Sequence, residues 1–118
     1  MARVLLVDDE PAGLELRKLI FEREGHRIFT ATEPISALAL FSEVQPDCVV
    51  LDLRLPEAAD GLALIRELRG ASPSVRIIVL AGWPPDLEGA PEAGMVNEIL
   101  AKPIRTAALL SALATSAD

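Results

Sequence analysis

The chain has 118 residues, of which 51% are hydrophobic and 25% charged, and this length and composition are typical of one globular domain. Eleven basic residues against 18 acidic ones give a net charge of −7, which argues against direct binding of nucleic acid through a basic face. One cysteine excludes an internal disulfide framework, and one histidine makes a Cys/His zinc site implausible. No apolar run reaches the ~18 residues that a membrane span needs, so we expect one cytoplasmic domain over residues 1–118.

Short, nearly continuous apolar segments rich in Val, Ile and Leu recur along the chain. Such segments are typical of strands buried on both faces of a parallel sheet. In chain order, the predicted strands are Arg3–Val7, Arg27–Ala31, Cys48–Asp52, Arg76–Leu80 and Asn97–Ala101, of which the second and the last are weaker. Five strands of this kind predict a parallel sheet as the centre of the domain.

Helical spacing of apolar residues fills most of the intervals between these strands. The predicted helices are Ala12–Glu24, Pro34–Val44, Gly61–Arg69 and Arg105–Ala114. This alternation indicates βαβ units, with helices on both faces of the sheet. The segment Gly82–Gly94 breaks the rhythm, because three prolines and three glycines in thirteen residues make a long helix costly. The fourth helix is therefore predicted to be short or irregular.

Charged side chains follow three of the predicted strands at the point where each strand ends. Asp8-Asp9-Glu10 follows the first strand, Asp52 ends the third, and Lys102-Pro103 follows the fifth. In an open parallel sheet, ligands bind beyond the carboxyl ends of the strands, so these groups are expected to meet there. Clustered carboxylates repel, and Mg²⁺ with oxygen ligands relieves that repulsion. A carboxylate held near Mg²⁺ and a lysine is equipped to attack a phosphoryl group.

Taken together and in this order, four segments resemble the receiver domain of two-component response regulators. They are Val7–Pro11, Leu51–Pro56, Asp60–Leu62 and Lys102–Pro103, and the resemblance runs from Arg3 to the last helix. The resemblance implies a flavodoxin-like (βα)5 three-layer sandwich, with a parallel five-stranded sheet of order 2-1-3-4-5. It also implies a cis peptide bond between Lys102 and Pro103.

The resemblance assigns a role to each charged residue at the strand ends. Asp52 is identified as the phosphoacceptor, and Lys102 as its partner at rest and as a partner of the phosphoryl oxygens after transfer. Asp9 is implied to bind Mg²⁺ directly and Asp8 mainly through water, while the backbone carbonyl of Arg54 completes the metal shell. The implied phosphodonor is a sensor histidine kinase or a histidine phosphotransfer protein, and such a domain catalyses only its own phosphorylation and dephosphorylation.

The chain departs from the family at two switch positions. The fourth strand of the family ends in Thr or Ser, whereas Ala81 stands here, and the aromatic residue of the fifth strand is replaced by Ile99. Arg54 and Trp83 occupy the two variable positions that flank the pocket in the family and tune hydrolysis. The acceptor chemistry does not need either missing side chain, but the coupling of phosphorylation to a surface change is brought into question.

Simpler interpretations stand beside several of these roles. Asp8 and Asp9 could cap the first helix and do nothing more, and Lys102 could be a solvated lysine. Glu10 is interpreted as a carboxylate at the start of that helix rather than as a metal ligand. Trp83 could cover the edge of the core or overhang the phosphorylation pocket.

Two further residues and one helix face are predicted to be structural. Cys48 at the start of a strand is interpreted as a small buried hydrophobe, and His26 after Gly25 as a solvated residue of a turn. The phosphodonor histidine belongs to a partner kinase in this interpretation. The Ala- and Leu-rich face of the last helix is assigned first to core packing and second to a partner surface.

Three functions are compatible with these patterns. The favoured one is a signalling module that Asp52 switches by phosphorylation, acting on an unknown output domain or downstream protein. The alternative is an atypical receiver that binds partners without phosphorylation, which the residues at positions 81 and 99 favour and the intact charged set opposes. The third is an aspartate-nucleophile phosphohydrolase, but Arg54 occupies the place of its second acid and no cap segment is present.

Overall fold

A computed structural model describes residues 2–116 and shows strands and helices in alternation. The strands are β1 (Arg3–Val7), β2 (Arg27–Ala31), β3 (Cys48–Asp52), β4 (Arg76–Ala81) and β5 (Glu98–Ala101). The helices are α1 (Pro11–Arg23), α2 (Pro34–Val44), α3 (Ala58–Ala71), α4 (Pro85–Glu88) and α5 (Thr106–Ser116), and a 3₁₀-helix, η1 (Pro91–Met95), follows α4. Within residues 2–116, no helix combines the length and the apolarity needed to cross a bilayer.

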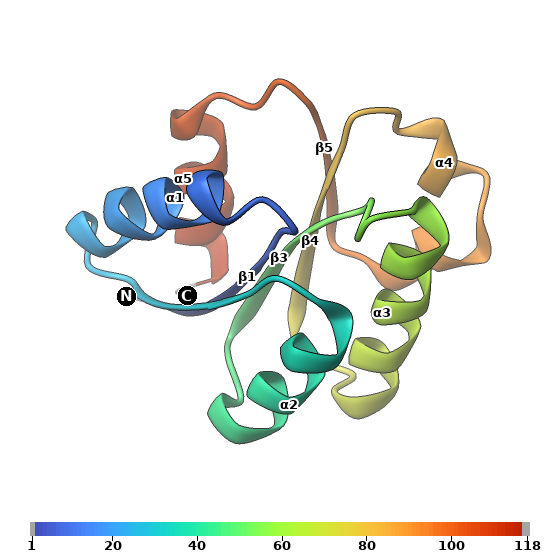
Figure 1. The fold of residues 1–118 in the computed structure, drawn as a ribbon, viewed down its shortest axis with the longest axis horizontal. Helices are drawn as coiled ribbons and strands as arrows, with labels where there is room; N and C mark the ends of the chain where they lie inside the picture. The colour runs from blue at the N-terminus through green and yellow to red at the C-terminus, as the bar shows by residue number, and fades with distance from the viewer. Residues whose placement is uncertain (1, 117–118) are drawn as a thin grey trace.

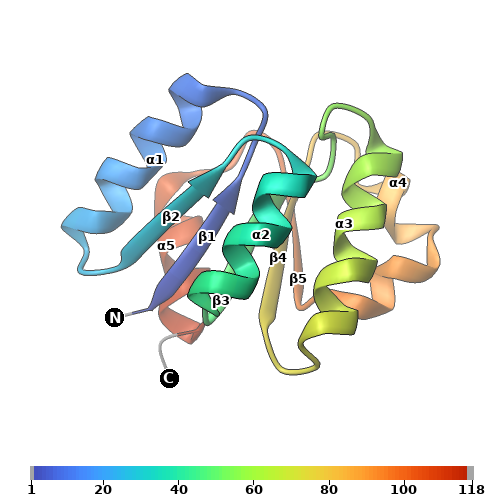
Figure 2. The same cartoon turned by 60° about the horizontal axis from the view of Figure 1, so that its bottom comes forward.

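The strands form one parallel sheet of order β2-β1-β3-β4-β5, which confirms the predicted fold class. Helices α1 and α5 cover one face of this sheet, and α2 and α3 cover the other (Figures 1 and 2). The three-layer arrangement follows from the strand sequences, because apolar residues on both sides of each strand need a covering layer on each face. The carboxyl ends of all five strands consequently lie at one edge of the molecule.

Alternate residues of each strand supply two separate hydrophobic cores. On β1, Val4 and Leu6 pack with the core beneath α1 and α5, while Leu5 and Val7 pack with the core beneath α2 and α3. This alternation is the ordinary consequence of the two-residue period of a strand. The Ala- and Leu-rich face of α5 contributes Leu109 to the first of these cores, as predicted.

The region of the fourth helix is short, as the prolines predicted. A single turn in α4 is followed by η1, and long side chains from α3 hold this segment in place. Arg66 Nη1 lies 2.5 Å from Glu92 Oε2, and this hydrogen bond holds the pKa of Glu92 below its usual range. Arg69 donates to the carbonyl of Met95 at 2.9 Å and to Oδ1 of Asn97 at 3.1 Å. The segment is therefore irregular but tied to α3 at several points.

Helix α3 begins three residues earlier than the predicted Gly61 and approaches the loop after β3 closely. Its first turn is closed by a hydrogen bond from the Glu57 amide to Asp60 Oδ2 at 3.0 Å. A Cβ atom on Gly61 would stand 1.8 Å from the carbonyl oxygen of Leu53. Glycine is therefore required at this position by space, and it brings α3 against the backbone that follows Asp52.

The two residues assigned to structure gave different outcomes. Cys48 is fully buried, as predicted. The prediction of a solvated His26 was wrong, because its ring is half-buried and Nδ1 accepts a hydrogen bond from the Ala2 amide at 3.1 Å. Partial burial lowers the pKa of His26 from its ordinary value of 6.5, since desolvation disfavours the charged ring. The histidine therefore anchors the start of β1.

Candidate functional site

The candidate site lies where β1 and β3 end, side by side at the centre of the sheet. Val7 and Leu51 are register partners on these strands, and Asp8 and Asp52 are the next residues of each. Both carboxylates are largely buried, with only 6% of Asp8 and 8% of Asp52 exposed. Buried carboxylates need charged or hydrogen-bonding partners, so their surroundings define what the site can do.

Asp52 has a partner for each carboxylate oxygen. The ammonium of Lys102 donates to Oδ2, and the backbone amide of Arg54 donates to Oδ1 at 3.3 Å. Lys102 reaches this position from the end of β5, where its own amide bonds the Ala81 carbonyl at 2.9 Å and a cis peptide bond joins it to Pro103. The interpretation of Lys102 as a merely solvated lysine was therefore wrong, and the cis bond is confirmed.

Asp8 has both a capping role and a charged partner. Its Oδ1 accepts a hydrogen bond from the Glu10 amide at 3.0 Å, at the start of α1, and Glu10 itself stands at the N-cap, as predicted. Its Oδ2 lies 3.1 Å from Nη1 of Arg17. Arg17 was not singled out in the sequence, because its nine-residue separation from Asp8 gave no signal of contact. Asp9 is exposed beside this pair.

The carboxylates at this edge suit a hard cation, but they are turned to the cations of the protein itself. Carboxylate oxygens beside a backbone carbonyl are the donor set that Mg²⁺ takes in proteins. Within residues 2–116, however, no three His, Cys, Asp or Glu side chains are gathered into a ready metal site. Arg17 and Lys102 stand against Asp8 and Asp52 instead, so a metal ion would compete with or join these two pairs.

The two predicted switch positions, near the ends of β4 and β5, carry no hydroxyl group. Ala81 is buried at the end of β4, beside Ala101 of β5. Ile99 pairs with Val79 in the sheet and packs against the core beneath α2 and α3. Ala81 can donate no side-chain hydrogen bond, and Ile99 is held as a packing residue.

The two residues predicted to flank the pocket have different surroundings. Arg54 extends to α4, where its Nη2 lies 2.7 Å from Oδ2 of Asp86. Trp83 is 62% exposed and belongs to neither core, which contradicts its interpretation as a cover for the core edge. Its role over the pocket stays a prediction.

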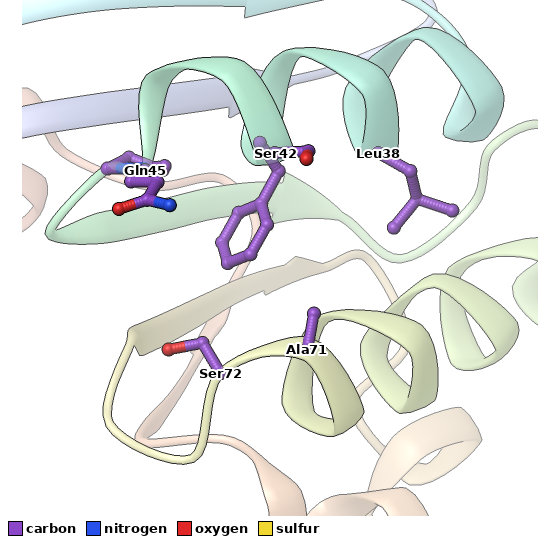
Figure 3. Close-up of a pocket in the computed structure, with 7 residues that line it drawn as sticks. Leu38, Ser42, Gln45, Ala71 and Ser72 are labelled. Carbon is purple, nitrogen blue, oxygen red and sulfur yellow. The ribbon is translucent and has the colours of Figure 1, made fainter.

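A separate cleft of about 340 Å³ lies between the C-terminal ends of α2 and α3 (Figure 3). It is lined by Leu38, Phe41, Ser42, Gln45, Pro46, Ala71 and Ser72. None of these side chains is charged, and the cleft is at the opposite edge of the sheet from Asp52. It is therefore no part of the acidic site.

A five-stranded parallel sheet of this order, with a buried acidic pair at the strand ends and a lysine that follows the last strand on one acid, is the arrangement expected of a receiver domain. A model of the response regulator receiver domain matches residues 4–114, nearly the whole chain. The chain belongs to this family, and it is a response regulator receiver domain of two-component signal transduction.

Individual relatives agree with this assignment. The chain is 34% identical over 114 residues to the transcriptional regulatory protein GlrR of Escherichia coli (strain K12), covering 95% of this chain and 25% of that protein. A response regulator receiver domain protein from Clostridium thermocellum is 28% identical, with a TM-score of 0.87 over 98% of this chain and 94% of that one. The response regulator TrrA of Thermotoga maritima, in complex with Mg²⁺ and BeF, is 29% identical, with a TM-score of 0.86 over 98% and 99% of the two chains. The chain thus spans about a quarter of GlrR and almost all of two solved receivers.

Proposed function

We propose that Asp52 accepts a phosphoryl group from the phosphohistidine of a sensor histidine kinase or a histidine phosphotransfer protein. The observation that carries this proposal is the ammonium of Lys102 on a carboxylate residue that is only 8% exposed. A buried carboxylate with one fixed cation is held in place for attack, and the same cation then meets the charge that the phosphoryl group brings.

The transfer needs little from the protein beyond position and charge. A carboxylate oxygen of Asp52 attacks phosphorus, the new O–P bond forms as the P–N bond breaks, and the leaving imidazole keeps its electron pair. Lys102 stays beside the acceptor as a partner for the phosphoryl oxygens, and the Arg54 amide orients the carboxylate. Asp9, Asp52 and the carbonyl of Arg54, with Asp8 through water, would hold Mg²⁺. The ion would neutralise charge on the transferring group.

We also propose the scope of this activity. Residues 1–118 act as one receiver domain in the cytoplasm, and the domain catalyses its own phosphorylation and dephosphorylation and no other reaction. Relatives such as GlrR are transcriptional regulators of which this chain spans a part, so the output is assigned to another domain or a downstream protein. The intact Asp52–Lys102 pair argues against a module that works without phosphorylation.

Small phosphodonors test the proposal without a kinase. Purified protein is incubated with Mg²⁺ and phosphoramidate or acetyl phosphate, and intact-protein mass spectrometry counts the phosphoryl groups gained. The wild type is expected to gain one group, Asp52→Asn none, and Glu67→Gln, which removes an exposed carboxylate of α3, one. Equal labelling of the wild type and Asp52→Asn, or no labelling of either, would contradict the assignment.

A further inference from the structure

The side chain and the backbone of Arg54 contact two different carboxylates. The Arg54 amide lies 3.3 Å from Oδ1 of Asp52, and its guanidinium lies 2.7 Å from Oδ2 of Asp86. The first carboxylate is the proposed phosphoacceptor, and the second belongs to α4. One residue therefore links the acceptor directly to the short helix of the region where the family pattern is lost.

We propose that phosphorylation of Asp52 draws the guanidinium of Arg54 away from Asp86 and onto the phosphoryl oxygens, which releases α4. This inference rests on the proposed function, because it takes phospho-Asp52 as its starting event. No covalent bond changes in the exchange itself, in which one ion pair replaces another. Arg54 then takes the place of the hydroxyl donor that the chain lacks at Ala81.

The charges favour the exchange. A phosphoryl group carries more negative charge than a carboxylate and offers three acceptor oxygens, and the planar fork of an arginine suits such a group. The phosphoryl group would form on Asp52, two residues before Arg54, whose backbone amide already donates to the Asp52 carboxylate. Because Ala81 supplies no side-chain donor, a phosphoryl oxygen is left for a group that can reach it.

The pair that must break is a weak one. The side chain of Arg54 is 54% exposed and that of Asp86 is 26% exposed, so water screens their attraction. Exposed ion pairs of this kind contribute little to stability, and either partner is readily exchanged for a stronger one. By contrast, the Lys102–Asp52 pair lies deeper in the site and stays with the acceptor.

Release of Asp86 affects a small and well-defined part of the surface. Helix α4 has one turn, and its Leu87 stays fully buried in the core beneath α2 and α3. The following 3₁₀-helix keeps its own tie, from Arg66 to Glu92. We therefore expect the change to be confined to α4 and the preceding loop, which carries the exposed Trp83.

A thermodynamic cycle tests the exchange. The probe is beryllofluoride with Mg²⁺, a tetrahedral mimic of the phosphoryl group, and calorimetry measures its affinity for four proteins: the wild type, Arg54→Met, Asp86→Asn and the double variant. Arg54→Met is expected to bind roughly tenfold more weakly, because it loses a charge-assisted hydrogen bond. Asp86→Asn is expected to bind a few-fold more tightly, because Asp86 no longer competes with the probe for Arg54, and the double variant should match Arg54→Met.

A control separates competition from simple charge. Glu88→Gln removes one negative charge from the same helix without touching the Arg54 pair, and it should leave the affinity unchanged. If Asp86→Asn still tightens binding in the Arg54→Met background, Asp86 acts on the probe by long-range electrostatics without Arg54, and the exchange is overturned. Wild-type affinity in Arg54→Met overturns it as well, while the binding itself upholds the proposed function. If the wild type neither binds the probe nor takes up phosphate, the proposed function fails, and the exchange fails with it.

Amide exchange gives a second readout that does not depend on affinity. Saturating Mg²⁺-beryllofluoride should speed exchange in residues 85–89 of the wild type, and it should cause no such change in Arg54→Met or Asp86→Asn, where the pair is already broken. Arg66→Met is the matched control, because it removes an arginine that pairs with η1 and does not contact Asp52. It should retain the probe-dependent change, and its loss there would overturn a role specific to Arg54.

Discussion

The carboxyl edge of the sheet divides into two halves that differ in how closely they follow the receiver family. Around β1 and β3, Asp8, Asp9 and Asp52 carry the acidic pattern on which the resemblance rests, and Lys102 reaches across to Asp52. Around β4 and β5, Ala81 and Ile99 occupy the positions interpreted as the two switch positions, and the fourth helix has one turn. Phosphoryl transfer requires particular atoms at fixed positions. The conformational change that follows it can be produced by different contacts in different proteins.

The tight approach of α3 to the loop after Asp52 gives the largest expected effect. Gly61→Ala places a Cβ atom 1.8 Å from a backbone carbonyl that cannot yield easily, and it should lower the free energy of unfolding by about 3 kcal/mol or more. Gly70→Ala in the same helix meets nothing within 4 Å and should raise it by about 0.5–1 kcal/mol. Urea denaturation of both variants checks this. Equal stability of the two would show that the close approach of α3 to the loop after β3 does not need a glycine at position 61.

A hydroxyl group restored at position 81, at the end of β4, should sharpen the comparison between the two halves of the edge. Ala81→Thr supplies a donor for a phosphoryl oxygen and should bind Mg²⁺-beryllofluoride roughly tenfold more tightly than Ala81→Val. Valine adds the same bulk at this buried position without the hydroxyl, so the steric cost cancels in the ratio of the two affinities. Calorimetry of the two variants measures that ratio, and a ratio of one would mean that no phosphoryl oxygen lies within reach of residue 81.

The ion pair between Arg17 and Asp8 should weaken the binding of Mg²⁺ beside the ends of β1 and β3. Arg17→Met removes a cation that lies 3.1 Å from Asp8 Oδ2, so it should raise the affinity for Mg²⁺ by about threefold, the size expected for a partly exposed pair. Lys18→Met makes the same change in net charge on the same helix and should have a smaller effect. Mg²⁺ titration by calorimetry, or by the fluorescence of Trp83, distinguishes them. An equal gain in both variants would reduce the effect to net charge.

The smallest effect belongs to His26, at the far edge of the sheet from the site. Because its pKa is lowered in the folded protein, the unfolded chain binds more protons below pH 6.5, and the stabilisation that is complete above pH 6.5 is lost as the pH falls through the lowered value. The free energy of unfolding of the wild type, relative to His26→Asn, should therefore decrease from about pH 7.5 to about pH 5. Urea denaturation across this range provides the curves. Curves that stay parallel would show that the Ala2–His26 bond does not depend on protonation.

Local patterns in the sequence were enough to predict the sheet and the position of Asp52 at its carboxyl edge. Strands such as Cys48–Asp52 are apolar on both sides, and in a chain of this length such short segments are typical of the central strands of a parallel sheet. Helix α2 has the predicted bounds because Pro34 begins it and the segment from Gln45 ends it. The charged residues at the strand ends could be placed at one edge because the topology of a parallel sheet leaves no other arrangement.

The pairing of long side chains could not be predicted in this way. Arg54 and Asp86 are 32 residues apart, and their contact depends on where a loop places one turn of helix. The early start of α3 had a usable signal, because an acidic residue at Glu57 followed by Asp60 is a variant of a capping box. No such signal marked His26, whose partner is a backbone amide at the start of the neighbouring strand.

The central claim is that Asp52, at the end of β3, accepts the phosphoryl group, and that the resulting conformational change occurs in α4 rather than in β5. Amide exchange followed fragment by fragment, in the wild type with and without phosphoramidate and Mg²⁺, tests this claim most directly. We expect slower exchange around residues 52–56, faster exchange in residues 85–89, and no change in the fragment that contains Ile99. Phosphorylation of Asp52 that alters exchange around Ile99 and leaves residues 85–89 unchanged would contradict it.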